Sequence, residues 1–114
     1  MSRRELDSYP TPTWATEMLL SHVSIQGTIL EPCAGEGWIS RALRDDSRQV
    51  YTNDINAKYD CDGAFDATLL PLWQLQTWDW IISNPPFSAA EKIVPLALQH
   101  AHHVAMLLRL SWLE

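Results

Sequence analysis

The segment Asn84-Pro85-Pro86-Phe87 combines an amide, two rigid residues and an aromatic ring in an order that ordinary packing does not require. The two prolines fix φ and remove two backbone donors, which leaves their carbonyls bare. Asn84 adds a side-chain amide, and Phe87 adds a flat face on which a planar ligand could stack. We interpret the segment as a candidate binding site for such a ligand. The alternative is a turn that ends a strand, with Phe87 packed in the core.

A glycine-containing loop, residues 31–37, is the second candidate. Gly35 and Gly37 allow backbone conformations and a close approach that a β-carbon would block, next to the start of a helix. The spacing is not that of dinucleotide folds, because Glu31 and Pro32 stand where an earlier glycine is expected. A carboxylate there would repel a pyrophosphate and attract a cationic ligand.

Two further carboxylates fit a nucleoside. Asp54, at the tip of the next predicted strand, is placed to accept hydrogen bonds from the two hydroxyls of a ribose. Asp66 could accept from the exocyclic amine of an adenine. Each carboxylate taken alone is better explained as a solvated loop residue or a cap. Together they suit a nucleoside that carries a positive charge.

Alternating strands and helices must position these groups. The sequence predicts strands at 28–30, 49–53, 65–68, 79–83 and 103–108, helices at about 13–23, 38–44 and 88–101, and a helical turn at 69–75 that Pro71 interrupts. This order favours an α/β fold, a Rossmann-like doubly wound parallel sheet of about five strands. The candidate residues would lie past the carboxyl ends of the strands, where open α/β sheets bind ligands.

The spacing of apolar residues predicts which face of the first helix is buried. That face consists of Trp14, Met18, Leu19 and either His22 or Val23, and Thr11 or Thr13 can cap the start of the helix.

In the last predicted helix, Ser88 is the candidate cap, and Pro95 should kink the helix or delay its start. Its expected apolar face is Ile93, Leu96, Ala97 and His100.

Composition indicates one ordinary globular domain over residues 1–114, with 46% hydrophobic and 19% charged residues. No signal peptide or membrane-spanning run is seen, so a cytoplasmic location is expected. The net charge of −6 predicts that this chain alone binds nucleic acid only weakly. Arg41, Arg44 and Arg48 form either a solvated helix face or a phosphate-contacting stripe.

Other reactive side chains receive structural interpretations. Cys33 is expected to pack as a small residue, and no metal site is expected because His100, His102 and His103 fall across a helix end and a strand start. The tryptophans are interpreted as core or rim residues, namely Trp38, Trp73, Trp78, Trp80 and Trp112.

The motifs taken in order resemble a known family. Residues 31–37, Asp54, Asp66 and Asn84-Pro85-Pro86-Phe87 are similar to the motif set of class I S-adenosylmethionine-dependent amino-methyltransferases, closest to DNA adenine methyltransferases. Residues 9–12, Tyr-Pro-Thr-Pro, resemble the segment that closes over the methionine part of the cofactor in that family. The likeness runs from about residue 9 to 110.

The resemblance implies an enzyme that uses S-adenosyl-L-methionine. Its catalytic residues would be Asn84, Pro85, Pro86 and Phe87, with the Asn84 oxygen and the Pro85 carbonyl as acceptors for the adenine amine. Phe87 would stack on the base after it leaves the DNA helix. The implied cofactor-binding residues are Thr11, Pro12, Glu31, Pro32, Gly35, Gly37, Asp54, Ile55 and Asp66.

The chain departs from the family at its C-terminus. The family's sheet has seven strands that end in an antiparallel hairpin, whereas this chain ends at Glu114, directly after the predicted fifth strand. A truncated domain is therefore expected, without a DNA-recognition domain. Either the chain is a fragment, or its gene is truncated, or a second copy or a partner chain covers the fifth-strand edge. RNA or protein glutamine remain alternative acceptors, and a non-catalytic cofactor-binding remnant remains an alternative function.

Overall fold

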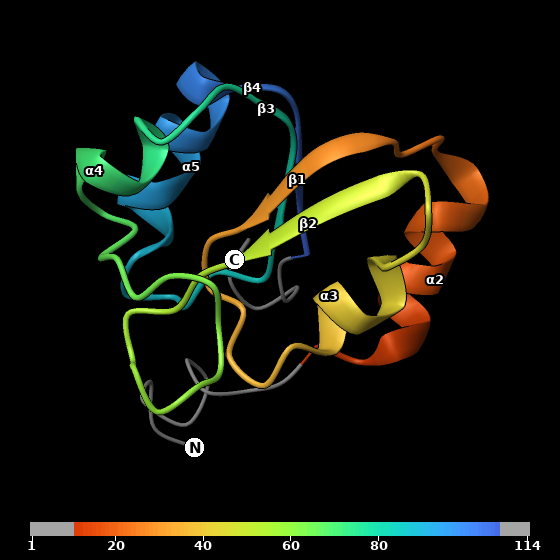
Figure 1. Cartoon of the computed structure of the whole chain (residues 1–114), viewed down its shortest axis with the longest axis horizontal. Coiled ribbons are helices and arrows are strands. Elements are labelled where there is room, and N and C mark those ends of the chain that lie inside the picture. The colour runs from red at the N-terminus through yellow and green to blue at the C-terminus, as the bar shows by residue number, and fades with distance from the viewer. Residues whose placement is uncertain (1–10, 108–114) are drawn as a thin grey trace.

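The computed structural model describes residues 11–107 (Figure 1). Its elements are α2 (Thr13–His22), β1 (Gly27–Glu31), α3 (Trp38–Leu43), β2 (Arg48–Thr52), α4 (Leu70–Trp73), β3 (Trp78–Ser83), α5 (Ala90–His100) and β4 (Ala101–Met106). Predictions that concern Tyr9, Pro10 and Trp112 lie outside the described residues. No helix in the described part is long and apolar enough to cross a membrane.

The four strands form one parallel sheet in the order β2-β1-β3-β4. The register places Ile29 of β1 between Val50 of β2 and Trp80 of β3, and pairs Ile81 with Val104 of β4. Because the order reverses between β1 and β3, their carboxyl ends open the crevice in which α/β sheets bind ligands. The Rossmann-like α/β fold expected from the sequence is confirmed.

The strand predicted at 65–68 is wrong, so the described sheet has four strands and not about five. Asn53 makes only an isolated bridge to Gly63. Its side chain hydrogen-bonds to both the backbone N–H and the backbone C=O of Phe65. A side chain thus satisfies the backbone groups that a strand ladder would have used. The segment is therefore a loop that is bonded to the residue after β2.

Each face of the sheet has its own apolar core, covered by a pair of helices. In Figure 1, α2 and α3 lie on one side of the sheet, and α4 and α5 lie on the other. Ile25, Ile29, Ile39, Leu43 and Ile82 form the core under α2 and α3. The core under α4 and α5 is larger and contains Leu30, Ala67, Leu72, Trp73, Trp78, Ile81, Ile93 and Ala97. Trp73 and Trp78 are therefore core residues, as expected.

The face predicted for the first helix is wrong at two of its positions. Trp14 is 64% exposed and Met18 is 57% exposed, while Thr16 is the fully buried residue of α2. Leu19 packs against the core as predicted, and Leu20, which was not predicted, packs there as well. The capping prediction is wrong as well, because Pro12 occupies the N-cap position and no side-chain cap bond forms. The two apolar positions that dominated the pattern, Trp14 and Met18, point away from the sheet.

The prolines affect the later helices differently. Pro71 lies in the first turn of α4, where a missing N–H costs nothing, so this short helix forms in spite of it. Pro95 lies inside α5 and does not delay its start. The predicted cap is wrong, because Ala89 and not Ser88 is the N-cap residue. Ile93 and Ala97 are buried on the expected face of α5.

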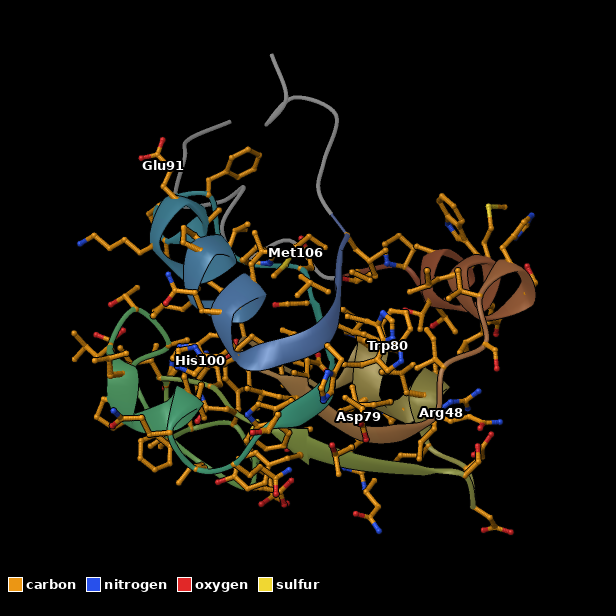
Figure 2. All side chains as sticks on the ribbon, turned by 90° about the horizontal axis from the view of Figure 1, so that it is seen from above. Arg48, Asp79, Trp80, Glu91, His100 and Met106 are labelled. Carbon is orange, nitrogen blue, oxygen red and sulfur yellow. The ribbon has the colours of Figure 1, made fainter. Side chains whose placement is uncertain are left out.

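Side chains form hydrogen bonds at the amino ends of the strands, and two of the residues involved, Arg48 and Asp79, are labelled in Figure 2. Asp79 accepts hydrogen bonds from the N–H (2.8 Å) and hydroxyl (3.1 Å) of Thr28, and these bonds lower the pKa of Asp79. Arg48 begins β2 and donates to the carbonyls of Ile25 and Leu43. Arg48 is therefore neither on a solvated helix face nor free to contact phosphate, which corrects that expectation.

Replacing Gly27 by alanine is expected to destabilise the fold by at least about 2 kcal/mol. Gly27 has φ +93°, and an added Cβ would meet the Asp79 carboxylate oxygen at 2.2 Å. The measurement is the free energy of unfolding in urea. Gly35→Ala is the matched control, because φ is +54° there and a Cβ would meet nothing within 4 Å. A loss at Gly27 no larger than the loss at Gly35 would contradict the steric argument.

Candidate active site

A cavity of about 740 Å³ lies at the carboxyl ends of the strands. It gathers residues from five separate segments: the stretch before α2, the glycine loop, the ends of β2 and β3, and the loop before α4. Of the residues that the sequence singled out, those lining it are Thr11, Glu31, Pro32, Gly35, Asp54, Ile55, Asp66, Asn84 and Pro86. Thr11 and Asn84, which are 73 positions apart in the chain, thus line the same cavity.

The remaining predicted residues adjoin this cavity in the sequence without lining it. Pro12 is exposed at the N-cap of α2, and Gly37 is the N-cap of α3. Pro85 is buried, and Phe87 is half-buried. The backbone therefore brings these four residues to the site region, while the cavity wall is made by their neighbours.

The glycine loop has the backbone shape that was expected of it. Gly35 and Gly37 have φ of +54° and +85°, values that residues with a side chain rarely adopt. Arg41 holds the loop from outside: its Nε donates to the Gly37 carbonyl (3.1 Å), its Nη2 donates to the Glu36 carbonyl, and its guanidinium lies over the Trp38 ring. The guanidinium of Arg41 thus hydrogen-bonds to the glycine loop, a role that the sequence did not predict.

Asp54 is oriented by two backbone donors. Its Oδ2 accepts from the N–H of Gly35 (2.9 Å), and its Oδ1 accepts from the N–H of Asn56 (2.9 Å). Each carboxylate oxygen has capacity for a second hydrogen bond. A fixed carboxylate with two such positions can bind two neighbouring hydroxyls.

Asp66 is held by Thr68 in a similar way. The hydroxyl (2.7 Å) and N–H (2.9 Å) of Thr68 both donate to Oδ1. These bonds lower the pKa of Asp66, so the carboxylate is ionised at neutral pH. Both bonds fall on one oxygen, and the other can accept from a ligand.

Asn53 connects the glycine loop to the segment that carries Asp66. Its side-chain amide donates to the carbonyls of Pro32 (3.0 Å) and Phe65 (2.9 Å), and its oxygen accepts from the N–H of Phe65 (2.9 Å). Its backbone also bonds to Glu31 and Ala34. Asn53 is fully buried, so one buried side chain joins the glycine loop to the segment before Asp66. In the sequence its only signal is weak, that of a polar residue at the end of a strand.

Glu31 is the most unusual group in the site. It is 1% exposed, and its Oε2 has no hydrogen-bond partner among the described residues. Burial raises the pKa of Glu31 to about 8, against a lowering by the Ser40 N–H and by Arg44. A buried acceptor that lines a cavity without a partner is a place for a ligand's donor.

The cavity is acidic. Four carboxylates line it, those of Glu31, Glu36, Asp54 and Asp66, and no Lys, Arg or His of the described residues does. Such a wall favours a cationic ligand and disfavours phosphates. Cys33 also lines the cavity, but burial raises the pKa of its thiol to about 12, which leaves it an unreactive packing residue.

The Asn-Pro-Pro-Phe segment leaves the end of β3 and leads into α5. The carbonyl of Pro86 accepts from the N–H groups of Ala89 and Ala90, both at 3.0 Å, and so begins the helix. Pro86 therefore does not present a bare carbonyl, which corrects the expectation for the second proline. The segment is held on its other side by a bond from the Leu107 N–H to the Ser83 carbonyl (2.8 Å).

In the part of the chain that the structure describes, no three His, Cys, Asp or Glu side chains are arranged so that they could hold a metal ion.

The parallel sheet and the cavity at its carboxyl ends define a Rossmann-like α/β domain. One solved structure with this fold is TrmN from Thermus thermophilus, with a TM-score of 0.68 and 21% sequence identity. The likeness covers 84% of this chain and 38% of the TrmN chain, so the chain spans well under half of that protein. No family model and no curated protein matches the sequence.

Proposed function

We propose that this chain binds S-adenosyl-L-methionine and transfers its methyl group to the exocyclic amine of adenine in DNA. The observation that carries the proposal is the meeting of Glu31, Asp54, Asp66 and Asn84 around one acidic cavity. A ligand with a sulfonium, an ammonium, a ribose and an aminopurine offers a matching group to each of the three carboxylates. The fold of TrmN supports a methyltransferase in general terms.

The cofactor's three parts divide among the walls of the cavity. Glu31 would receive the ammonium of the methionine end, where its unpartnered oxygen needs a donor. Asp54 would bind the ribose hydroxyls, with Gly35 allowing close approach. Asp66 would accept from the adenine amine, and Ile55 would pack against the ring.

Thr11, Pro12, Pro32 and Gly37 complete the proposed cofactor site, with Thr11 and Pro32 at the cavity wall and the other two beside it.

The chemistry requires activation of a poor nucleophile. The bound cofactor supplies a methyl group on a positively charged sulfur. The lone pair of an aromatic amine is delocalised, and the Asn84 side-chain oxygen and the Pro85 carbonyl would draw the amine toward a tetrahedral shape. They would stabilise the charge that develops on the nitrogen as it attacks. Phe87 would stack on the extruded base, and transfer would be direct.

Acceptors other than DNA remain candidates. RNA and protein glutamine also present planar amino groups, and the acidic chain has few cations with which to hold a nucleic acid, since Arg41 and Arg48 already bind backbone carbonyls. A cofactor-binding domain without catalytic activity is the third possibility. The fit of the cavity to the cofactor is common to all three.

The test is transfer of a labelled methyl group from S-adenosylmethionine to pools of DNA, RNA and protein. We expect the label in DNA. It should resist RNase and protease, and digestion of the DNA should release it as a methylated adenine. Label confined to RNA or protein would mean that the acceptor is not DNA, although the chain would still be a methyltransferase. Cofactor binding without transfer to any pool would leave a binding domain.

Replacing Asp54 by asparagine is expected to weaken S-adenosylmethionine binding by about tenfold to a hundredfold, because hydrogen bonds to a charged group contribute about 1.5–3 kcal/mol. Calorimetric titration measures the dissociation constant. Asp60→Asn makes the same charge change on an exposed side chain of the same loop and should bind normally. Equal affinities of the two variants for S-adenosylmethionine would show that Asp54 does not bind the ribose.

A further inference from the structure

Glu31 is a buried acid without a counterion in contact. It ends β1, is 1% exposed, and its Oε2 has no partner among the described residues. No salt bridge of the described residues involves it. An ionised carboxylate in such a place loses its hydration without gaining a cation, so the protonated form is favoured while the cavity is empty.

The groups that face Glu31 do not reverse this balance. Arg44 on α3 attracts the charge, but its own side chain is exposed and makes no bond to Glu31. Asp54, after β2, repels the charge. Cys33 and Cys61 adjoin the same wall as neutral thiols, since burial raises the pKa of both. The net effect of burial and neighbours raises the pKa of Glu31 to about 8.

We propose that Glu31 carries a proton in the empty site and releases it to solvent when the ammonium group of the cofactor binds. Cofactor binding is then linked to pH through this one side chain. The inference rests on the proposed function, because it takes the ligand to be one that places a cationic amine at Glu31.

The proton balance is simple. At pH 6.5 the ligand enters as an ammonium, the carboxylic O–H of Glu31 breaks, and its proton goes to the buffer while the ammonium keeps all its hydrogens. The complex contains a carboxylate and an ammonium in contact. Above about pH 8, a free α-amine is largely neutral and Glu31 is already ionised, so binding takes up a proton instead.

The experiment is calorimetric titration of the full chain in pairs of buffers that differ in ionisation enthalpy, which yields the number of protons exchanged. With S-adenosylmethionine we expect release of about one proton at pH 6.5, a crossing near pH 8, and uptake at pH 9. Between pH 6 and 7 the affinity should rise roughly tenfold for the one unit of pH, because one proton leaves per ligand bound.

A second ligand isolates the amino acid end. 5′-Methylthioadenosine has the nucleoside and the sulfur but no ammonium, so its binding should exchange no proton at any of these pH values. Proton release of equal size with this ligand would overturn the inference, because the source would then lie at the nucleoside end.

Two variants isolate the side chain. Glu31→Gln should abolish proton release at pH 6.5 and still bind 5′-methylthioadenosine, which shows that the cavity is folded. Glu36→Gln changes an exposed carboxylate of the same cavity and should release the proton as the parent does. Release that persists in Glu31→Gln, or cofactor binding by the parent without release, would overturn the inference while leaving the proposed function standing. Failure of the folded parent to bind either ligand would overturn both.

Discussion

Replacing Asn84 by alanine is expected to lower the rate of methyl transfer by about 10²–10³-fold and to leave the dissociation constant of S-adenosylmethionine within about threefold. The side-chain oxygen of Asn84 is proposed to bind the acceptor amine most strongly when positive charge develops on it, so its loss removes transition-state stabilisation. Cofactor affinity is spared because Glu31, Asp54 and Asp66 are proposed to hold the cofactor. Single-turnover kinetics with saturating cofactor measure the chemical step directly.

The matched control at this position is Asn84→Asp, which keeps an acceptor oxygen of nearly the same geometry. It should recover part of the rate that alanine loses, because acceptance and not donation is the proposed role. A rate that alanine leaves intact would remove Asn84 from the site. Equal losses of transfer and cofactor binding in Asn84→Ala would show that the residue acts in shaping the cavity.

Replacing Glu31 by glutamine is expected to stabilise the empty protein at pH 8 by up to about 5 kcal/mol. Glu31 has a pKa near 4.5 when unfolded and about 8 when folded, so between these values the folded state binds more protons than the unfolded state. The stability of the parent therefore falls as the pH rises from about 4.5 to about 8. Glutamine has no proton to lose, and its amide resembles the protonated carboxyl in shape and in its hydrogen-bonding groups.

Urea unfolding of parent and variant at pH 4.5, 6.5 and 8, without ligand, measures this difference. The two curves should nearly coincide at pH 4.5 and separate as the pH rises, with the variant the more stable. The same variant should bind S-adenosylmethionine more weakly. Stability differences that do not change across this range would mean that Glu31 is ionised in the folded protein and has a partner.

The sequence predicted which residues meet at the site better than the contacts that hold them there. Strand positions followed from apolar runs next to glycines and prolines, and parallel topology then required Glu31, Asp54 and Asn84 to converge at the carboxyl ends. Each of these residues ends a strand or lies within two residues of a strand end, so element order sufficed to group them. Their roles in binding and catalysis remain proposals.

The features that were missed depend on distant contacts. Asn53 takes the backbone groups of Phe65, so a segment with strand-forming residues became a loop. On α2, Trp14 and Met18 were predicted to be buried beside Leu19, yet the side of the helix that packs against the core carries Thr16 and Leu20 together with Leu19. Local periodicity cannot show which of two weakly apolar faces finds a partner, because that depends on the rest of the fold.

The two ends of the sheet have consequences for evolution that differ in kind. At the amino ends, Asp79 and Thr28 bond to each other and Arg48 bonds to backbone carbonyls, so each interaction is complete within the chain. Another pair that satisfies the same groups could replace them, and drift there is limited by stability alone. At the carboxyl ends, one carboxyl oxygen of Glu31 is left without a partner at a cost in stability. We expect such a residue to be retained only where a bound ligand offsets that cost, so under the proposed function the carboxyl ends should tolerate fewer substitutions than the amino ends.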